Sequence, residues 1–65
     1  MYTYYLGSFS DGAKLYEIDR KKAVELNGND NIQMMEEYAF CDVSYNNNGM
    51  GEYENNGLIV EYLEV

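Results

Sequence analysis

The sequence predicts one compact α+β domain over residues 1–65, predominantly β, with a small antiparallel sheet of four to five strands and one short helix near 31–38. Asn-Gly and Asp-Gly pairs recur along the chain, and such pairs tolerate the positive φ that tight hairpin turns require. The stretches between them are rich in aromatic and β-branched residues, which favour strands. Apolar and aromatic residues make up 46% of the chain, so we expect a folded core despite the short length.

Five segments are predicted to be strands because their side chains alternate or because they are aromatic and β-prone. In chain order they are 2–7, 14–19, 22–26, 37–45 and 58–65. Turn signals stand at Asp11-Gly12, Asn27-Gly28, Asn48-Gly49 and Asn56-Gly57. Alternation in 37–45 places Cys41 in an apolar face and predicts a buried thiol. In 58–65 the two faces are Leu58, Val60 and Tyr62 on one side, and Ile59, Leu63 and Val65 on the other.

Residues 12–26 have a second interpretation, a helix that Gly28 would end. At about 100° per residue, however, Asp19 and Lys22 interrupt its apolar stripe. A hairpin with its turn at residues 20–21 is therefore preferred. The predicted helix near 31–38 has Asp30 as its N-cap and contains two methionines, which are good helix formers.

The Asn56-Gly57 turn fixes the register of a hairpin. With these two residues as the loop, the predicted pairs are Asn55 with Leu58, Glu54 with Ile59, Tyr53 with Val60 and Glu52 with Glu61. The last pair sets two like charges opposite each other, which is destabilising. This register implies that the acidity was selected against a cost in stability.

The composition excludes several classes of chemistry. The chain has no His and one Cys, so it lacks the usual proton carrier of nucleophile systems and the ligands of structural zinc sites. The EF-hand pattern also fails, because Ile32 stands where a loop starting at Asn27 needs Gly. We expect no enzyme activity, no cofactor and no metal. A single Cys and the absence of a signal peptide or long apolar run predict a cytoplasmic protein that does not enter a membrane.

Charge is the most informative property of the sequence. The formal net charge is −8, and residues 36–65 contain seven acidic residues and no basic one. Such a segment repels nucleic acids and anionic lipids, and it attracts basic surfaces. The sequence therefore predicts a protein partner with a basic surface, with no direct binding of nucleic acid.

Eight tyrosines offer large contact areas at low entropic cost, which suits binding interfaces. Those expected in the core are Tyr16, Tyr38 and Tyr62. Those expected at the surface are Tyr2, Tyr4, Tyr5, Tyr45 and Tyr53. Together with the acids, two of them complete the predicted partner-binding set: Glu36, Glu37, Asp42, Glu52, Tyr53, Glu54, Glu61, Glu64 and Tyr45.

In size and charge the whole chain resembles the small acidic inhibitors that phages encode against host defence nucleases, anti-CRISPR proteins among them, and nucleic-acid mimics generally. The resemblance is one of profile and assigns no residue a role. It implies a stoichiometric inhibitor that occupies the basic nucleic-acid-binding surface of a protein complex in the host cytoplasm. We expect the protein to be a monomer or homodimer.

Two other mechanisms remain open. In the first, the protein is an antitoxin, an immunity-type partner or an assembly subunit, and it docks through an aromatic sheet face or a strand edge. In the second, it is a homo-oligomer held by an exposed edge at residues 58–65. Salt separates electrostatic binding from the others, because only the former weakens steeply between about 50 and 200 mM.

Overall fold

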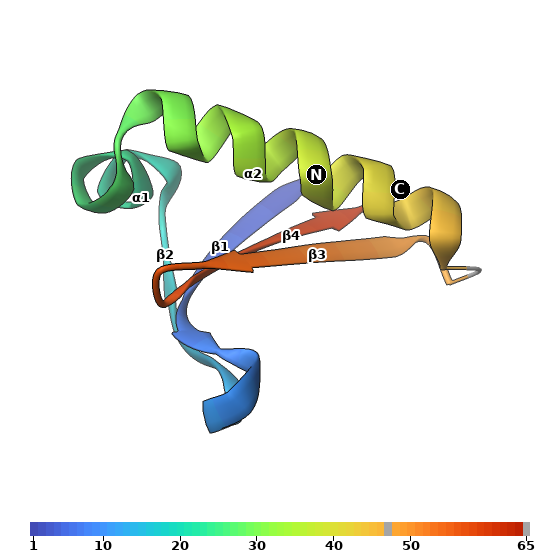
Figure 1. Ribbon diagram of the computed structural model, residues 1–65, viewed down its shortest axis with the longest axis horizontal. Coiled ribbons are helices and arrows are strands. Elements are labelled where there is room, and N and C mark those ends of the chain that lie inside the picture. The colour runs from blue at the N-terminus through green and yellow to red at the C-terminus, as the bar shows by residue number, and fades with distance from the viewer. Residues whose placement is uncertain (47, 65) are drawn as a thin grey trace.

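A computed structural model describes residues 1–46 and 48–64. In chain order the main elements are β1 (Tyr2–Ser8), β2 (Ala13–Ile18), α1 (Arg20–Asn27), α2 (Asn29–Asp42), β3 (Met50–Asn55) and β4 (Leu58–Leu63), with 3-10 turns at Phe9–Asp11 and Val43–Tyr45. The strands form one antiparallel sheet in the order β2-β1-β4-β3. Both helices lie on the same side of this sheet (Figure 1). The fold is therefore α+β, as predicted. One face of the sheet is covered by the helices; the other, called the open face below, has no helix of the described residues against it, although Ile59 and Glu61 on it are buried.

The structure contains more helix than the sequence predicted. The two helices take nearly as many residues as the four strands, so a predominantly β fold with one short helix is wrong in that detail. The predicted helix at 31–38 lies inside α2, which continues to Asp42. Ile32, Met35 and Ala39 are fully buried, and their spacing of three and four residues is that of one helix face.

The expected strand at 37–45 is consequently wrong. Ala39 belongs to the buried stripe of α2, whereas Cys41 lies on the outer surface of the same helix and its thiol is exposed. Small and apolar residues occupy every second position of 37–45, and this alternation is typical of a strand. In the structure, however, the residues of α2 that are buried against the sheet follow the helical period. The buried thiol predicted at Cys41 is wrong for the same reason.

The expected strand at 22–26 is also wrong, because these residues form α1. Asp19 has an extended backbone, and its carboxylate accepts a hydrogen bond from the Lys22 N–H at 2.8 Å, which starts the helix after β2. Gly28 ends α1, as the helical interpretation of 12–26 predicted, although the first part of that range is strand β2. The apolar stripe is weak because α1 buries only Ala23.

The predicted hairpin at Asn56-Gly57 is confirmed. Both residues have positive φ, 53° and 77°, and all four predicted pairs from Asn55–Leu58 to Glu52–Glu61 occur. The predicted faces of 58–65 hold for β4, while Val65 lies outside the described residues. Because β4 pairs with β1 on one side and β3 on the other, the expected exposed edge at 58–65 is wrong.

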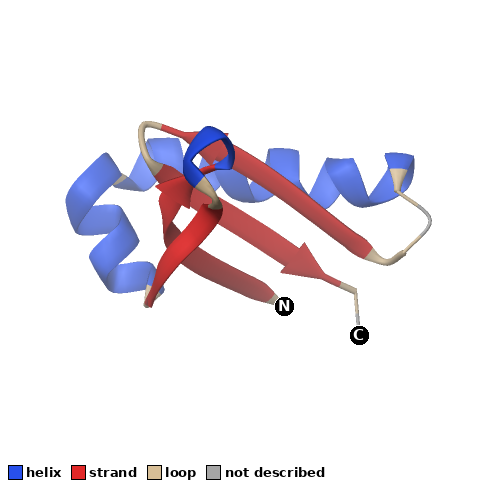
Figure 2. Cartoon of the chain, turned by 90° about the horizontal axis from the view of Figure 1, so that it is seen from below, coloured by secondary structure: helices blue, strands red, loops and turns tan. Residues whose placement is uncertain are grey.

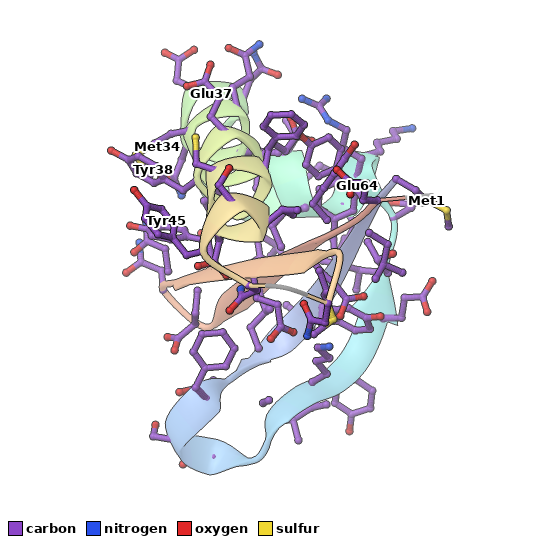
Figure 3. All side chains as sticks on the ribbon, turned by 90° about the vertical axis from the view of Figure 1, so that its right-hand side faces the viewer. Met1, Met34, Glu37, Tyr38, Tyr45 and Glu64 are labelled. Carbon is purple, nitrogen blue, oxygen red and sulfur yellow. The ribbon has the colours of Figure 1, made fainter. Side chains whose placement is uncertain are left out.

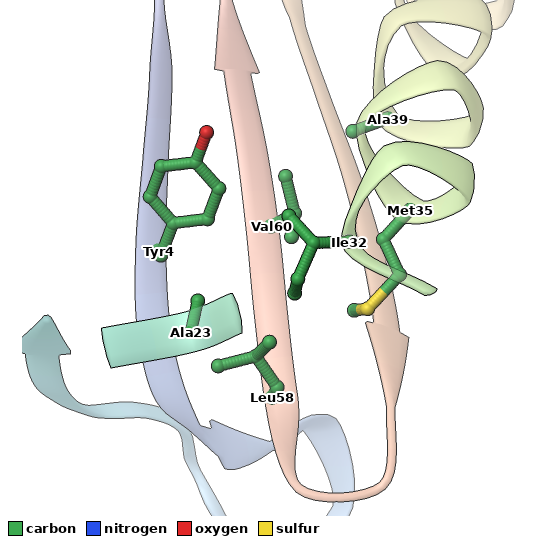
Figure 4. Close-up of a cluster of buried hydrophobic side chains, with 7 residues drawn as sticks. All are labelled: Tyr4, Ala23, Ile32, Met35, Ala39, Leu58 and Val60. Carbon is green, nitrogen blue, oxygen red and sulfur yellow. The ribbon is translucent and has the colours of Figure 1, made fainter. Parts of the chain in front are cut away.

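The core lies between the helices and the sheet (Figure 4). Its buried members are Tyr4, Ala23, Ile32, Met35, Ala39, Leu58 and Val60. The expectations for three tyrosines are reversed: Tyr4 is 6% exposed, whereas Tyr16 and Tyr38 are 69% and 49% exposed. Tyr4 is buried because β1 is an interior strand, and Tyr16 is exposed because it lies on edge strand β2.

Helix α2 approaches β3 closely at Gly51. A Cβ at this position would lie 2.0 Å from the Ala39 carbonyl oxygen and 2.8 Å from the Val43 nitrogen. Glycine is therefore required for the helix to lie against this strand, and the contact fixes where the end of α2 and its acidic side chains are placed.

Candidate functional site

The acids predicted to form one binding surface lie on two opposite sides of the sheet. Glu36 and Glu37 belong to α2, on the helix-covered side. Glu52 and Glu54 alternate with Tyr53, which packs against the core, so both point to the open face, as does Glu61 opposite Glu52. Figure 2 shows this open face with the helices behind it. The single anionic plate expected from the sequence is therefore not formed.

On the open face, Lys14 lies between Glu52 and Glu61. Its Nζ forms an ion pair with the Glu61 carboxylate and lies 2.7 Å from Oε2 of Glu52. The same Nζ lies 5.3 Å from the centroid of the Tyr5 ring, whose hydroxyl donates to Glu61 at 3.5 Å. Burial lowers the pKa of Lys14, but its hydrogen bonds and charge interactions with the two acids outweigh this effect and raise it.

This arrangement changes the meaning of the Glu52–Glu61 pair. Glu61 is only 5% exposed, so two unpaired like charges here would be costly. Lys14 comes from β2, two strands away from β4, and supplies the positive charge. The two like charges are therefore not unpaired, as the register alone implied, because Lys14 joins them in an internal ion cluster.

Glu36 is also engaged by the fold. Arg20 donates to it from Nε at 2.7 Å and from Nη2 at 3.3 Å, and the buried Tyr4 hydroxyl donates to the same carboxylate. Burial raises the pKa of Glu36. The hydrogen bonds from Arg20 and Tyr4 lower it by a larger amount, so the net shift of this pKa is downward. Burial and the Glu36 bond together raise the pKa of Tyr4.

Asp42 and Glu54 hold backbone groups. Asp42 accepts the Glu52 N–H at 3.1 Å and the Asn46 side-chain amide at 2.9 Å, and Asn46 also donates to the Met50 carbonyl at 3.2 Å. Glu54 accepts the Phe9 N–H at 3.3 Å. The bonds to Glu52 and Met50 occupy polar groups on edge strand β3, which limits the pairing of another strand there.

Three predicted site residues, Glu37, Glu64 and Tyr45, are exposed and have no side-chain partner within residues 1–46 and 48–64; Tyr45 is 85% exposed. Figure 3 shows Glu37 on the outer side of α2 and Tyr45 on one flank with Met34 and Tyr38. Glu64 lies on the opposite flank beside Met1. Tyr53 is half-buried and packs under Tyr38, with 4.9 Å between ring centroids. The free predicted residues therefore surround the end of α2 without forming one cluster.

Sequence reasoning missed a pocket on the flank of α2. This shallow, mainly apolar pocket of about 430 Å³ is lined by Tyr2, Glu37, Phe40 and Cys41. Three of these residues, Glu37, Phe40 and Cys41, are three and four residues apart on α2 and therefore share a helix face. The sequence prediction ended the helix near residue 38, so it did not bring them together.

Among residues 1–46 and 48–64, no group of three His, Cys, Asp or Glu side chains is placed to hold a metal ion. No helix in the described ranges has the length and apolar character needed to cross a membrane. Fold and surface define a small acidic α+β protein with a two-helix layer on a four-stranded sheet. No protein-family model, curated protein or solved structure matches the chain.

Proposed function

We propose that this protein is a non-enzymatic, cytoplasmic inhibitor that occupies the basic, nucleic-acid-binding surface of a target protein complex, as anti-CRISPR proteins and other nucleic-acid mimics do. The observation that carries the proposal is the sign of the charge left after folding. Lys14 and Arg20 are engaged with acids, and the other two basic side chains, Lys21 and Lys22, both lie in the first turn of α1. Away from that turn, every unpaired charged side chain in the described residues is acidic.

The end of α2 is the part of this surface best suited to a basic partner. Glu37 is exposed in the C-terminal half of α2, and the last turn contains Asp42 and no basic residue. The helix macrodipole adds partial negative charge at its C-terminus, and nothing in that turn offsets it. Glu64 and the exposed Tyr45 lie around the same end of the molecule. In this proposal Glu36, Glu52 and Glu61 support the fold, while the free acids meet the partner.

Affinity capture from the natural host at about 50 and 200 mM salt tests the proposal. An electrostatic complex should be lost steeply over this range, because released counterions carry much of the affinity. Added nucleic acid should displace the protein from its captured partner. A complex that resists both salt and nucleic acid contradicts the proposal.

Charge reversal locates the contact. The double variant Glu37→Lys/Glu64→Lys should weaken binding to the captured partner at least about tenfold, since it reverses two exposed charges near the end of α2. Asp11→Lys/Glu25→Lys is the matched control: it makes the same change in net charge at exposed positions elsewhere. Equal weakening by both pairs would show that only the net charge matters.

A second candidate function is docking of a protein partner along β2, as an antitoxin, immunity-type partner or assembly subunit would do. It is favoured by the contrast between the two edge strands, because no side chain in the described residues hydrogen-bonds the backbone of β2. Leu15 and Tyr16 on this strand are 59% and 69% exposed. Binding that resists salt and is abolished by Leu15→Glu would favour this function over the first.

A further inference from the structure

The pocket on the flank of α2 has walls that packing holds in place. The ring of Phe40 meets Tyr62 edge-on at 5.0 Å between centroids, and the ring of Tyr2 lies 4.8 Å from the same Tyr62. One half-buried tyrosine of β4 thus supports aromatic walls contributed by α2 and β1. Phe40 is nevertheless 53% exposed, so it remains accessible to a ligand where it lines the pocket.

The pocket is also electronegative. Glu37 lines it, is exposed to solvent, and forms no ion pair or hydrogen bond within the described residues. Burial raises the pKa of the Tyr2 hydroxyl, and the nearby charges of Glu36 and Glu37 raise it further. Glu36 is occupied by Arg20, so Glu37 is the carboxylate available to an incoming group.

We propose that this pocket receives an arginine side chain of the basic partner, with the guanidinium against the rings of Tyr2 and Phe40 and paired with the Glu37 carboxylate. This inference rests on the proposed function, which supplies the basic partner. A guanidinium is planar and weakly hydrated, so it stacks on aromatic rings while it donates to a carboxylate. Anionic groups are repelled by Glu37, and a purely apolar side chain would leave that charge without a partner.

Titration of the ¹⁵N-labelled protein with a capped hexaarginine peptide tests the site directly. The expected result is a set of amide shift changes centred on Tyr2, Glu37, Phe40 and Cys41. Glu37→Gln should weaken binding about fivefold, and so should Phe40→Leu, which keeps apolar volume but removes the ring face. Glu25→Gln removes one charge from an exposed position of α1 and should change affinity less than about twofold.

Capped hexacitrulline and hexalysine peptides separate the contributions. The neutral hexacitrulline should not bind, and hexalysine should bind more weakly than hexaarginine because an ammonium group has no plane to stack. Equal binding of hexalysine overturns the assignment to arginine. Shifts located elsewhere, equal effects of Glu37→Gln and Glu25→Gln, or no binding of hexaarginine overturn the pocket. Capture from the host at two salt concentrations uses no peptide, so the proposed function is judged separately.

Discussion

Five of the seven acids of the C-terminal half fall into two groups that behave differently. Glu36, Glu52 and Glu61 are partly or fully buried and paired with Arg20 or Lys14, whereas Glu37 and Glu64 face solvent. The sequence gives both groups the same charge, and the fold separates them by their position on a helix face or a strand face. A segment without basic residues can therefore be neutralised locally by residues distant in sequence, and only its outward-facing acids remain for a partner.

Lys14 is the cation that pairs with two of the buried acids, so its removal should have the largest effect on stability. Lys14→Met leaves Glu61, whose side chain is 7% exposed, without its cation and facing Glu52. We expect a loss of about 2–3 kcal/mol in the free energy of unfolding, at or below the lower end of what breaking a buried pair costs, because Lys14 itself is 31% exposed. Chemical denaturation measures the change.

Two further variants determine whether the cost arises from an unpaired acid. Lys22→Met removes the same charge from an exposed position of α1 and should cost less than about 0.5 kcal/mol. Adding Glu61→Gln to Lys14→Met should recover part of the loss, because it removes the uncompensated charge. A cost at Lys14 no larger than at Lys22 would show that Glu52 and Glu61 belong with the solvent-facing acids.

The next largest effect is expected at Tyr4. Tyr4→Phe removes the hydroxyl that donates to Glu36 from within the core. Among the described residues, this leaves Arg20 as the donor to the partly buried carboxylate. We expect a loss of about 1–2 kcal/mol, toward the lower part of the range of about 1.5–3 kcal/mol for a hydrogen bond to a charged group, because the Arg20 hydrogen bonds to Glu36 remain. Tyr5→Phe is the matched control, because the Tyr5 hydroxyl makes a longer bond of 3.5 Å to Glu61 and should matter less. Equal losses would contradict this ranking.

The pairing of Glu36 also predicts how stability depends on pH. Its pKa is lower in the folded protein than the ordinary value of about 4.3, so it contributes stability above that pH and loses the contribution as the pH falls toward the folded pKa. The difference in unfolding free energy between the wild type and Glu36→Gln should therefore be largest above about pH 5 and shrink on acidification. Denaturant titrations between pH 3 and 6 measure it, and a constant difference would contradict the lowered pKa.

The sequence was sufficient for features that depend on local backbone geometry. Asn56 and Gly57 adopt the positive φ that their types favour, and this turn sets the whole register of β3 against β4. Side-chain alternation then assigns Val60 and Glu61 to opposite faces without further information. The four pairs next to the turn were therefore predicted correctly, and the structure continues the same register through Gly51–Tyr62 and Met50–Leu63.

Features that depend on distant parts of the chain were not accessible in the same way. Residues 37–42 alternate like a strand, and only the burial of Ala39 beside Ile32 and Met35 favours the helix. The position of Lys14 between Glu52 and Glu61 follows from the strand order β2-β1-β4-β3, which no local pattern specifies. The site prediction thus identified acids by type and could not separate the engaged from the free ones.

Asp42 should show the smallest net effect, because two contributions oppose each other there. Asp42→Ala removes the acceptor for the Glu52 N–H and the Asn46 amide, but it also removes a negative charge from the last turn of α2, where the macrodipole disfavours it. We expect a net loss below about 1 kcal/mol, accompanied by greater self-association in sedimentation experiments, since a polar group of edge strand β3 becomes free. Asp42→Asn keeps an oxygen acceptor without the charge, and should match or exceed the wild type in stability. A loss at Asp42→Asn comparable to that of Lys14→Met would place Asp42 among the acids whose charge the fold requires.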